Sequence, residues 1–533
     1  MTKRREPAWM PSEDPGEEEV AAARSGRAGR LARSTAFFSI ATAASRIAGL
    51  VREIVAASYF GVKGPMSAFT IAFQVPNLIR SLFADAAIQA AFVPVFTEAL
   101  EKGDKREAFR LASTMIFMVA LILGALTAFF ILLAPVVMDV FAPGYEGELL
   151  DLTIALSQLL FPILVLLGMT GMVVGVLNSY DRFGAFAISP LFWNVAIIAV
   201  LVGLAPVFPE GDEIYAYAIG ILVGTVIQLA IPAFDLRNTP FRLRPVLDWR
   251  SPTVRRVLLL MLPVTISLGL INFNFQINSF FGTLIEDPTV AERAPAAIDK
   301  AFRIYMLPQG IFSVAIATVL FPTLARYAAR ADTDGLRATM ANGMRQILFL
   351  LIPAAAAILV LAEPMTRLVY ERGVFDEAST DIVSEALFWF AFSLPFNGLF
   401  LLLTRTFFSL QRPWLPTLIS LANLVITAGV ALLLYEPFGV GGIVAATGIA
   451  TVFSVVAEAI VLRGPLGRLE LGSLFWSGSR IVLAAAALAG VSFLVWDVLD
   501  AELGRGLGAQ IVSLGVALAA GATAYAVPIP ALR

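Results

Sequence analysis

The chain consists of repeated apolar runs, each long enough to cross a lipid bilayer. A membrane-spanning helix needs roughly 20 mostly apolar residues, and runs of at least this length occur fourteen times between residues 34 and 530. Lipid offers no hydrogen-bond partners to an exposed backbone, so runs of this kind cross it as helices. The sequence therefore predicts an all-α polytopic membrane protein with fourteen transmembrane helices.

The loops between these runs predict the orientation. Cytoplasmic loops carry an excess of Lys and Arg, and from a cytoplasmic N-terminus the alternate loops hold most of the 38 basic residues. The opposite loops hold only Lys63, Arg293, Lys300, Arg367, Arg372 and Arg505. We therefore expect a multi-pass protein of the cell (inner, cytoplasmic) membrane with both termini in the cytoplasm.

The composition excludes most catalytic chemistry. Hydrophobic residues make up 58% of the chain, and it contains neither Cys nor His. Disulfides, thiolate nucleophiles, His-based acid/base catalysis and His or Cys metal ligands are thus excluded. The formal net charge of -2 gives no electrostatic reason to expect nucleic acid as a partner. We expect no catalytic residue, no cofactor and no metal, and a protein that moves its ligand rather than an enzyme.

A weak internal repeat of about 230 residues divides the chain. Its matched pairs are Pro76 with Pro308, Arg182 with Arg412, and Asn194 with Asn423. Each repeat holds an even number of predicted spans, so the two repeats share one orientation, and transporters of this kind bind substrate between their halves. The predicted divisions are a disordered cytoplasmic tail (1–33), an N-lobe of helices 1–6 (34–235), a C-lobe of helices 7–12 (254–463) and helices 13–14 (473–530).

Four arginines fall inside predicted spans, where each costs about 2.5–3.5 kcal/mol on insertion scales. They are Arg46, Arg52, Arg80 and Arg303. Only Glu53 and Asp85 are available there as acidic partners, which leaves an excess of about +2. Interhelical ion pairing is one interpretation. The excess favours the other, an anion site, because the planar guanidinium group suits phosphate or pyrophosphate oxygens.

Further polar and flexible positions accompany these arginines. We predict that four polar or ion-pairing side chains line the cavity of this anion site, namely Ser45, Glu53, Asn77 and Asp85. Gly49 lies in the middle of the polar face of helix 1. Prolines inside helices are a common cause of kinks, so Pro76 and Pro308 are predicted kink positions. Gly49 is a predicted hinge position in helix 1.

Several segments resemble the MurJ (MviN) family of lipid II flippases, within the multidrug/oligosaccharidyl-lipid/polysaccharide exporter superfamily. They are SRIAGLVRE at 45–53, FQVPNLIR at 73–80, LFAD at 82–85, QAAFVP at 89–94 and NSYDR at 178–182. The similarity extends over nearly the whole chain after the tail. Two departures stand out: Ser67 occupies a position where the family frequently has Asp, and helices 7 and 11 contain no acidic residue that would support a sodium site.

The resemblance implies two six-helix lobes around a central cationic cavity, with helices 13 and 14 forming a groove for a polyprenyl tail. It implies that Arg46, Arg52, Arg80 and Arg303 match the family's cavity arginines, and that Ser45 and Glu53 match adjacent polar positions. The expected activity is flipping of lipid II (undecaprenyl-pyrophosphoryl disaccharide-pentapeptide) from the cytoplasmic to the outer leaflet by alternating access. Lipid II and membrane lipids are the expected partners of a monomer, and cell-wall synthesis proteins are further candidates.

Three alternatives stay open at this point. The first is a flippase for another polyprenyl-linked oligosaccharide, and the second is a membrane glycosyltransferase or polymerase. The third is a non-transporting scaffold, which would tolerate loss of all four arginines.

Overall fold

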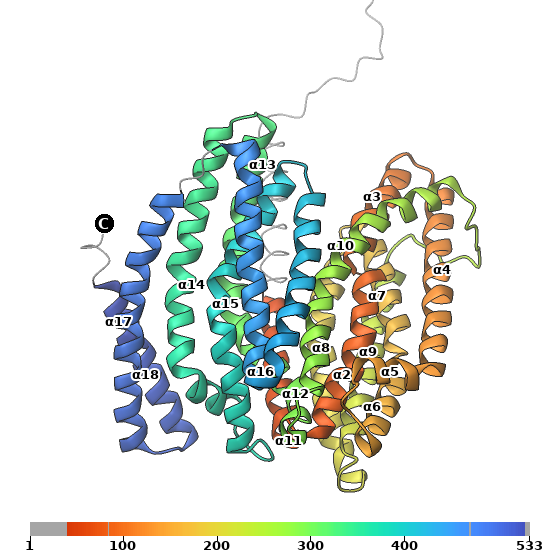
Figure 1. Cartoon of the computed structure of the whole chain (residues 1–533). Coiled ribbons are helices and arrows are strands. Elements are labelled where there is room, and N and C mark those ends of the chain that lie inside the picture. Colours follow the sequence, from red (N-terminus) through yellow and green to blue (C-terminus); the bar gives the residue numbers. More distant parts are fainter. Residues whose placement is uncertain (1–39, 84, 468–470, 528–533) are drawn as a thin grey trace, which may run out of the picture.

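The computed structural model describes residues 40–83, 85–467 and 471–527. The side chains at 80–90, 262–272, 275, 471, 473 and 475 lie outside this description, as does the predicted tail at 1–33. The described residues are mostly helical and contain no strand (Figure 1), which confirms the all-α prediction. Ten of the described helices are long and apolar enough to cross a membrane, so the chain is a polytopic membrane protein, and the number fourteen stays a prediction.

The N-terminal half begins with a helix at residues 40–60. It continues with eight α-helices, which are α2 (Gly64–Phe83), α3 (Asp85–Glu101), α4 (Lys105–Leu132), α5 (Ala134–Phe141), α6 (Gly147–Leu160), α7 (Ile163–Asn178), α8 (Gly184–Leu204) and α9 (Ile214–Asp235). Short 3₁₀ turns follow α8 (Ala205–Val207) and α9 (Leu236–Asn238). A buried apolar cluster that includes Phe92, Phe96, Leu111 and Phe161 packs α3, α4 and the connection between α6 and α7 together.

The C-terminal half begins with α10 (Pro252–Thr283) and α11 (Pro288–Ala291). It continues with α12 (Ala294–Pro308), a π-helical turn η3 (Gln309–Ser313), α13 (Val314–Ala329), α14 (Thr333–Tyr370), α15 (Glu377–Ser409) and α16 (Trp414–Leu466). The predicted kink residue Pro308 ends α12, where the π-helical turn begins. The other predicted kink residue, Pro76, lies inside α2.

α16 consists of two antiparallel arms. Gly439 interrupts the helix with φ +51 and ψ -133, a conformation that glycine adopts without steric cost. The chain folds back there, since Asn423 Nδ2 of the first arm donates a 2.9 Å hydrogen bond to Ser454 Oγ of the second. The single assignment at 414–466 therefore contains two of the predicted spans.

The last two helices, α17 (Leu471–Leu503) and α18 (Leu507–Ala526), pack on each other and on α14. Figure 1 shows this pair at the left edge of the molecule. Arg367 of α14, which is 2% exposed, holds α17 through a 2.6 Å ion pair between its Nη2 and Asp500 Oδ1. The predicted assignment of Arg367 to a loop is therefore wrong, because the guanidinium group is buried between two helices.

Aspartates begin several helices by capping their first free N–H groups. The carboxylates of Asp104, Asp332 and Asp376 accept hydrogen bonds from backbone N–H groups in the first turns of α4, α14 and α15, at 3.0, 2.8 and 2.9 Å. These caps end the loops and fix where the long apolar helices start.

The two halves close against each other at the end of the molecule where α11 lies, at the bottom of Figure 1. Val374 N, in the loop between α14 and α15, donates a 2.9 Å hydrogen bond to Ser58 O near the end of the first helix. Beside it, a Cβ on Gly373 would lie 2.3 Å from Ser58 O. Gly144 lies even closer to Thr283 at the end of α10, where a Cβ would be 1.7 Å from Thr283 O. Only glycine permits these two approaches between the halves.

Candidate functional site

A charged cluster centred on Glu53 joins the two halves inside the helix bundle. Lys300 Nζ of α12 contacts Glu53 Oε2 at 2.6 Å, and Arg303 Nη1 contacts Glu53 Oε1 at 3.2 Å. Arg52 Nη2 also pairs with Glu53 Oε1. One carboxylate from the first helix is thus shared by three cations, two of which belong to the opposite half.

Burial makes this cluster unusual for a group of charges. Lys300 has no exposed surface, and Glu53 and Arg52 are 4% and 7% exposed. Tyr370, at the end of α14, covers Lys300, with Nζ 5.7 Å from the centre of the ring. Taking ions out of water costs several kcal/mol each unless they are paired, so the cations and Glu53 depend on one another.

Arg52 still has unused hydrogen-bonding capacity. Its guanidinium carbon lies 4.6 Å from the ring centre of Trp193, which orients the plane of the group. Its Nε and Nη1 atoms are buried and have no hydrogen-bond partner among the described residues. Unpaired buried donors are costly, so this arginine can accept a further anionic or polar ligand.

A cavity of about 350 Å³ opens beside the cluster. It is lined by Arg52, Glu53, Asp299 and Arg303, by the polar side chains of Thr70, Gln74 and Asn77, and by an aromatic wall that includes Phe69, Phe73, Trp193 and Tyr217. Arg303 is 37% exposed and is held by Asp299 at 2.9 Å. The cavity therefore presents a positioned guanidinium group, Arg303, next to the partly unpaired Arg52.

The other predicted site residues lie elsewhere or outside the description. Arg46 has an exposed side chain. The carbonyl of Ser45 accepts a 3.3 Å hydrogen bond from Asn194 Nδ2, and Gly49 lies against the same amide. The side chains of Arg80 and Asp85 lie outside the described residues. The structure thus brings together Arg52, Glu53, Asn77 and Arg303.

Two residues of the cluster were missed by the sequence prediction. The predicted loop position of Lys300 is wrong, because this residue lies within α12 and is completely buried. Asp299, four residues before Arg303, is absent from the predicted set of site residues. The available signal was the spacing of Asp299 and Arg303 at positions i and i+4 of one helix, which favours ion pairing.

These two residues also change the charge balance. The described cluster holds the cations Arg52, Lys300 and Arg303 against the carboxylates Glu53 and Asp299. Its excess is +1, lower than the expected +2 for a set that included Arg46, Arg80 and Asp85.

Ser67, the position of a frequent family Asp, connects the two halves in a different way. Its buried hydroxyl oxygen accepts a 3.2 Å hydrogen bond from the backbone N–H of Ala296 in the first turn of α12. A neutral side chain thus satisfies a free N–H group at the start of this helix.

Comparison with known proteins gives consistent matches. The family model described as "Lipid II flippase MurJ" matches residues 56–507. A probable lipid II flippase MurJ of Rhizobium meliloti is 33% identical over 470 residues, covering 86% of this chain and 85% of that protein. A lipid II flippase MurJ of Burkholderia cenocepacia is 30% identical over 392 residues, covering 72% and 75%.

Solved structures show the same fold. A lipid II flippase MurJ in an inward closed conformation superposes with a TM-score of 0.77 at 21% identity, covering 93% of this chain and 99% of that one. An inward-facing multidrug resistance MATE family transporter of the MOP superfamily gives a TM-score of 0.67 at 15% identity, covering 80% and 95%. Because the family model covers most of the chain and relatives reach 33% identity, the chain belongs to the lipid II flippase MurJ family.

Proposed function

We propose that this protein flips lipid II from the cytoplasmic to the outer leaflet of the cell membrane by alternating access, and that the cavity beside Glu53 binds the pyrophosphate. The relatives named as lipid II flippases support the substrate. The observation that carries the binding site is Arg52, whose Nε and Nη1 are buried without a partner beside the half-exposed Arg303.

Pyrophosphate suits this pair of arginines chemically. A guanidinium group offers a planar fork of donors that matches phosphate oxygens in two parallel hydrogen bonds. Glu53 pairs with both arginines and offsets part of their charge. An arriving pyrophosphate replaces the carboxylate as the partner of Arg303 and weakens the tie between the first helix and α12.

In this proposal, the contacts between the halves break and re-form as the cavity opens alternately to the two sides of the membrane. The end of the molecule that carries Val374 and Ser58 is closed, and we assign it to the outer face of the membrane, with both termini in the cytoplasm. Ligand binding loosens the Glu53 cluster, the Val374–Ser58 contact breaks, and the cavity opens outward. Solved MATE transporters in inward-facing and outward-facing conformations support such a cycle.

The remaining predicted parts fit this proposal. We assign α17 and α18, within the predicted 473–530 region, to the groove that guides the polyprenyl tail, because they pack on the outside of the C-terminal half. We propose the N-lobe at 34–235 and the C-lobe at 254–463 as the two units that move against each other. The protein acts as a monomer and a transporter, and the substrate leaves it chemically unchanged.

A depletion experiment tests this function. Cells that depend on this protein are depleted of it, and the fraction of labelled lipid II on the outer face is measured. We expect lipid II to accumulate inside and the cells to lyse. If the sidedness of lipid II is unchanged and another polyprenyl-linked oligosaccharide is trapped inside, that oligosaccharide is the substrate and lipid II is not. Unchanged sidedness of every such lipid would contradict flipping.

A further inference from the structure

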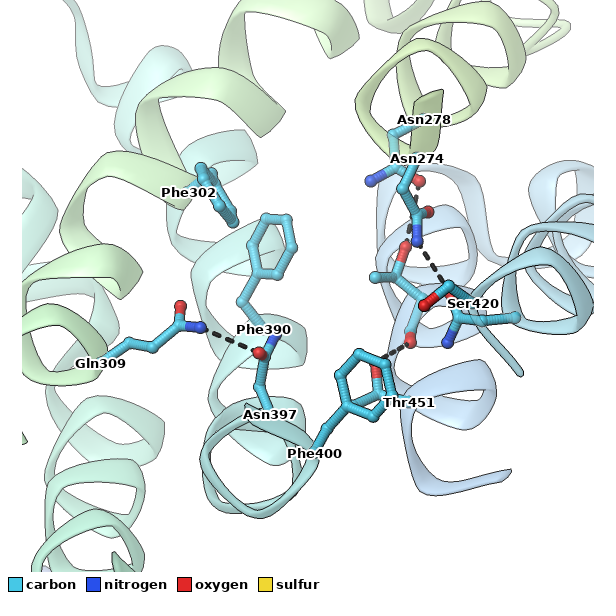
Figure 2. A pocket seen from close by; sticks show the side chains of 11 residues that line it. Asn274, Asn278, Phe302, Gln309, Phe390, Asn397, Phe400, Ser420 and Thr451 are labelled. Carbon is cyan, nitrogen blue, oxygen red and sulfur yellow. Dashed lines mark hydrogen bonds between the residues drawn. The ribbon is translucent and has the colours of Figure 1, made fainter. Parts of the chain in front are cut away.

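A second cavity, of about 220 Å³, lies within the C-terminal half between α10, α12, α15 and α16. Figure 2 shows the side chains that line it. Five are carboxamides, namely Asn274, Asn278, Gln309, Asn397 and Asn423, and three are phenyl rings, while Ser420, Thr447 and Thr451 add hydroxyl groups. None of the eleven lining side chains is charged.

Hydrogen bonds hold these carboxamides in fixed orientations. Asn274 Nδ2 donates to Asn423 Oδ1 at 2.9 Å, and Gln309 Nε2 donates to Asn397 Oδ1 at 2.8 Å. Both pairs are drawn in Figure 2. Each carboxamide has two donor hydrogens and two acceptor lone pairs, so one bond to a neighbour leaves capacity for a ligand.

One acceptor in this network has no partner. Asn274 Oδ1 is buried and unpaired among the described residues, although Nδ2 of the same side chain is bonded. A buried acceptor left unpaired carries the cost of losing its hydrogen bonds to water. A ligand that donates a hydroxyl or amide hydrogen removes this cost, and a bare anion cannot.

The phenyl rings limit the ligand further. Phe302 of α12 and Phe390 of α15 form one wall, with ring centres 5.6 Å apart and the ring planes at 61°. A small cation would exchange its water shell for neutral oxygens and this apolar wall, without a carboxylate in the lining. A sugar ring has C–H faces that pack on phenyl rings and edge hydroxyls that bond to carboxamides, so it matches both surfaces.

The position of this pocket links it to the Glu53 cluster. Arg303 of α12 lines the charged cavity, and its neighbour Phe302 lines the neutral pocket. Consecutive helical residues point about 100° apart, so the two sites lie on adjacent sides of α12. A ligand in which a pyrophosphate is joined to an uncharged sugar could therefore place the pyrophosphate in the charged cavity and the sugar in the neutral pocket.

We propose that this neutral pocket binds the N-acetylated sugar portion of the lipid-linked substrate while the arginines bind its pyrophosphate. This inference rests on the proposed function. The pocket then gives the protein its preference for saccharide-bearing lipid over bare polyprenyl pyrophosphate.

Binding measurements on the purified full-length protein in lipid nanodiscs test the pocket. The probes are lipid II and undecaprenyl pyrophosphate, which carries no sugar. We expect the wild type to bind lipid II about tenfold more tightly, as one or two net hydrogen bonds provide. Asn278→Leu and Asn397→Leu remove carboxamides at similar volume and should bring the ratio close to one, with the affinity for undecaprenyl pyrophosphate unchanged.

A matched control is Thr427→Val. Thr427 is a fully buried residue of α16 whose hydroxyl oxygen has no partner among the described residues, and it does not line the pocket. This variant should keep the wild-type ratio.

The outcomes separate the two proposals. An unchanged ratio in both Asn variants, or an equal loss of affinity for both lipids, overturns the sugar pocket. A cation site is tested by comparing thermal stability in NaCl and in choline chloride. If NaCl stabilises the wild type but not Asn278→Leu, and the lipid ratio is unchanged, the pocket binds a cation and the sugar pocket is overturned. If the wild type binds neither lipid, the proposed function itself fails.

Discussion

Glu53 and Lys300, 247 positions apart in the chain, form a 2.6 Å ion pair in which the lysine side chain is completely buried. The pair connects the first helix of the N-terminal half with α12 of the C-terminal half. Arg52 and Arg303 share the same carboxylate. The contact between the halves and the candidate anion site are therefore parts of one cluster, so a ligand that competes for the arginines also acts on the contact.

Replacing Lys300 with Met should destabilise the protein strongly. The substitution leaves Glu53 buried without the partner of its Oε2 atom, and breaking a buried pair costs about 3–5 kcal/mol. Thermal unfolding in detergent measures the change. Lys63→Met, at an exposed lysine, is the control and should unfold like the wild type. Equal stability of the two variants would show that Lys300 does not support the cluster.

A cross-link at the closed end should stop flipping. The chain has no native Cys, so a Ser58→Cys, Val374→Cys double variant carries the only thiols. Val374 N lies 2.9 Å from Ser58 O. We therefore expect a disulfide under oxidation, loss of flipping, and recovery after reduction. Each single variant serves as a control. Full flipping by a completely cross-linked protein would mean that this end does not open.

Gly373→Ala should disfavour the closed end. The residue has φ +63, and an added Cβ would lie 2.3 Å from Ser58 O, so the two halves must separate there. In the Ser58→Cys, Val374→Cys background, disulfide formation should slow several-fold. Gly103→Ala has a similar φ of +78 but no atom near the added Cβ. It controls for backbone strain, which costs about 1–2 kcal/mol, and equal rates in the two variants would contradict the close approach.

The docking of α17 should depend on Arg367. Arg367→Met removes the 2.6 Å pair with Asp500 and the contact with Trp496, whose ring centre lies 5.7 Å from the guanidinium carbon. We expect a loss of about 3–5 kcal/mol, as for other broken buried pairs, visible as earlier unfolding. Glu377→Gln breaks the exposed 3.8 Å pair with Arg505. Exposed pairs contribute little, so this control should unfold normally, and an equally mild Arg367→Met would refute the anchoring role.

The fold class could be predicted from the sequence because long apolar runs have one stable form in lipid. The polar face of helix 1 could also be predicted, since Arg52 and Glu53 are adjacent in the chain. The burial of Lys300 and, in part, of Asp299 could not be predicted, because both residues lie at the start of an apolar run, where charged residues usually face water. Their burial arises from packing against the first helix and Tyr370, which residues far away in the chain provide.

The neutral pocket illustrates a second limit. Asn274, Asn397 and Asn423 lie on α10, α15 and α16, and nothing in their spacing along the chain links them. Asn194 and Asn423 match in the internal repeat, and each bonds to the first helix of its own half, at Ser45 O and Asn274 Nδ2. The repeat thus indicates equivalent positions, but the side chains around Asn423 make a pocket only in three dimensions.

The sidedness of lipid II in cells with a single altered copy tests the central claim most directly. The only copy carries Arg52→Gln with Arg303→Gln, and an exposed Arg256→Gln copy is the control. At normal abundance of the protein, we predict that lipid II stays on the inner face in the double variant and reaches the outer face in the control. Normal transfer of lipid II by the double variant would contradict pyrophosphate binding at this cluster.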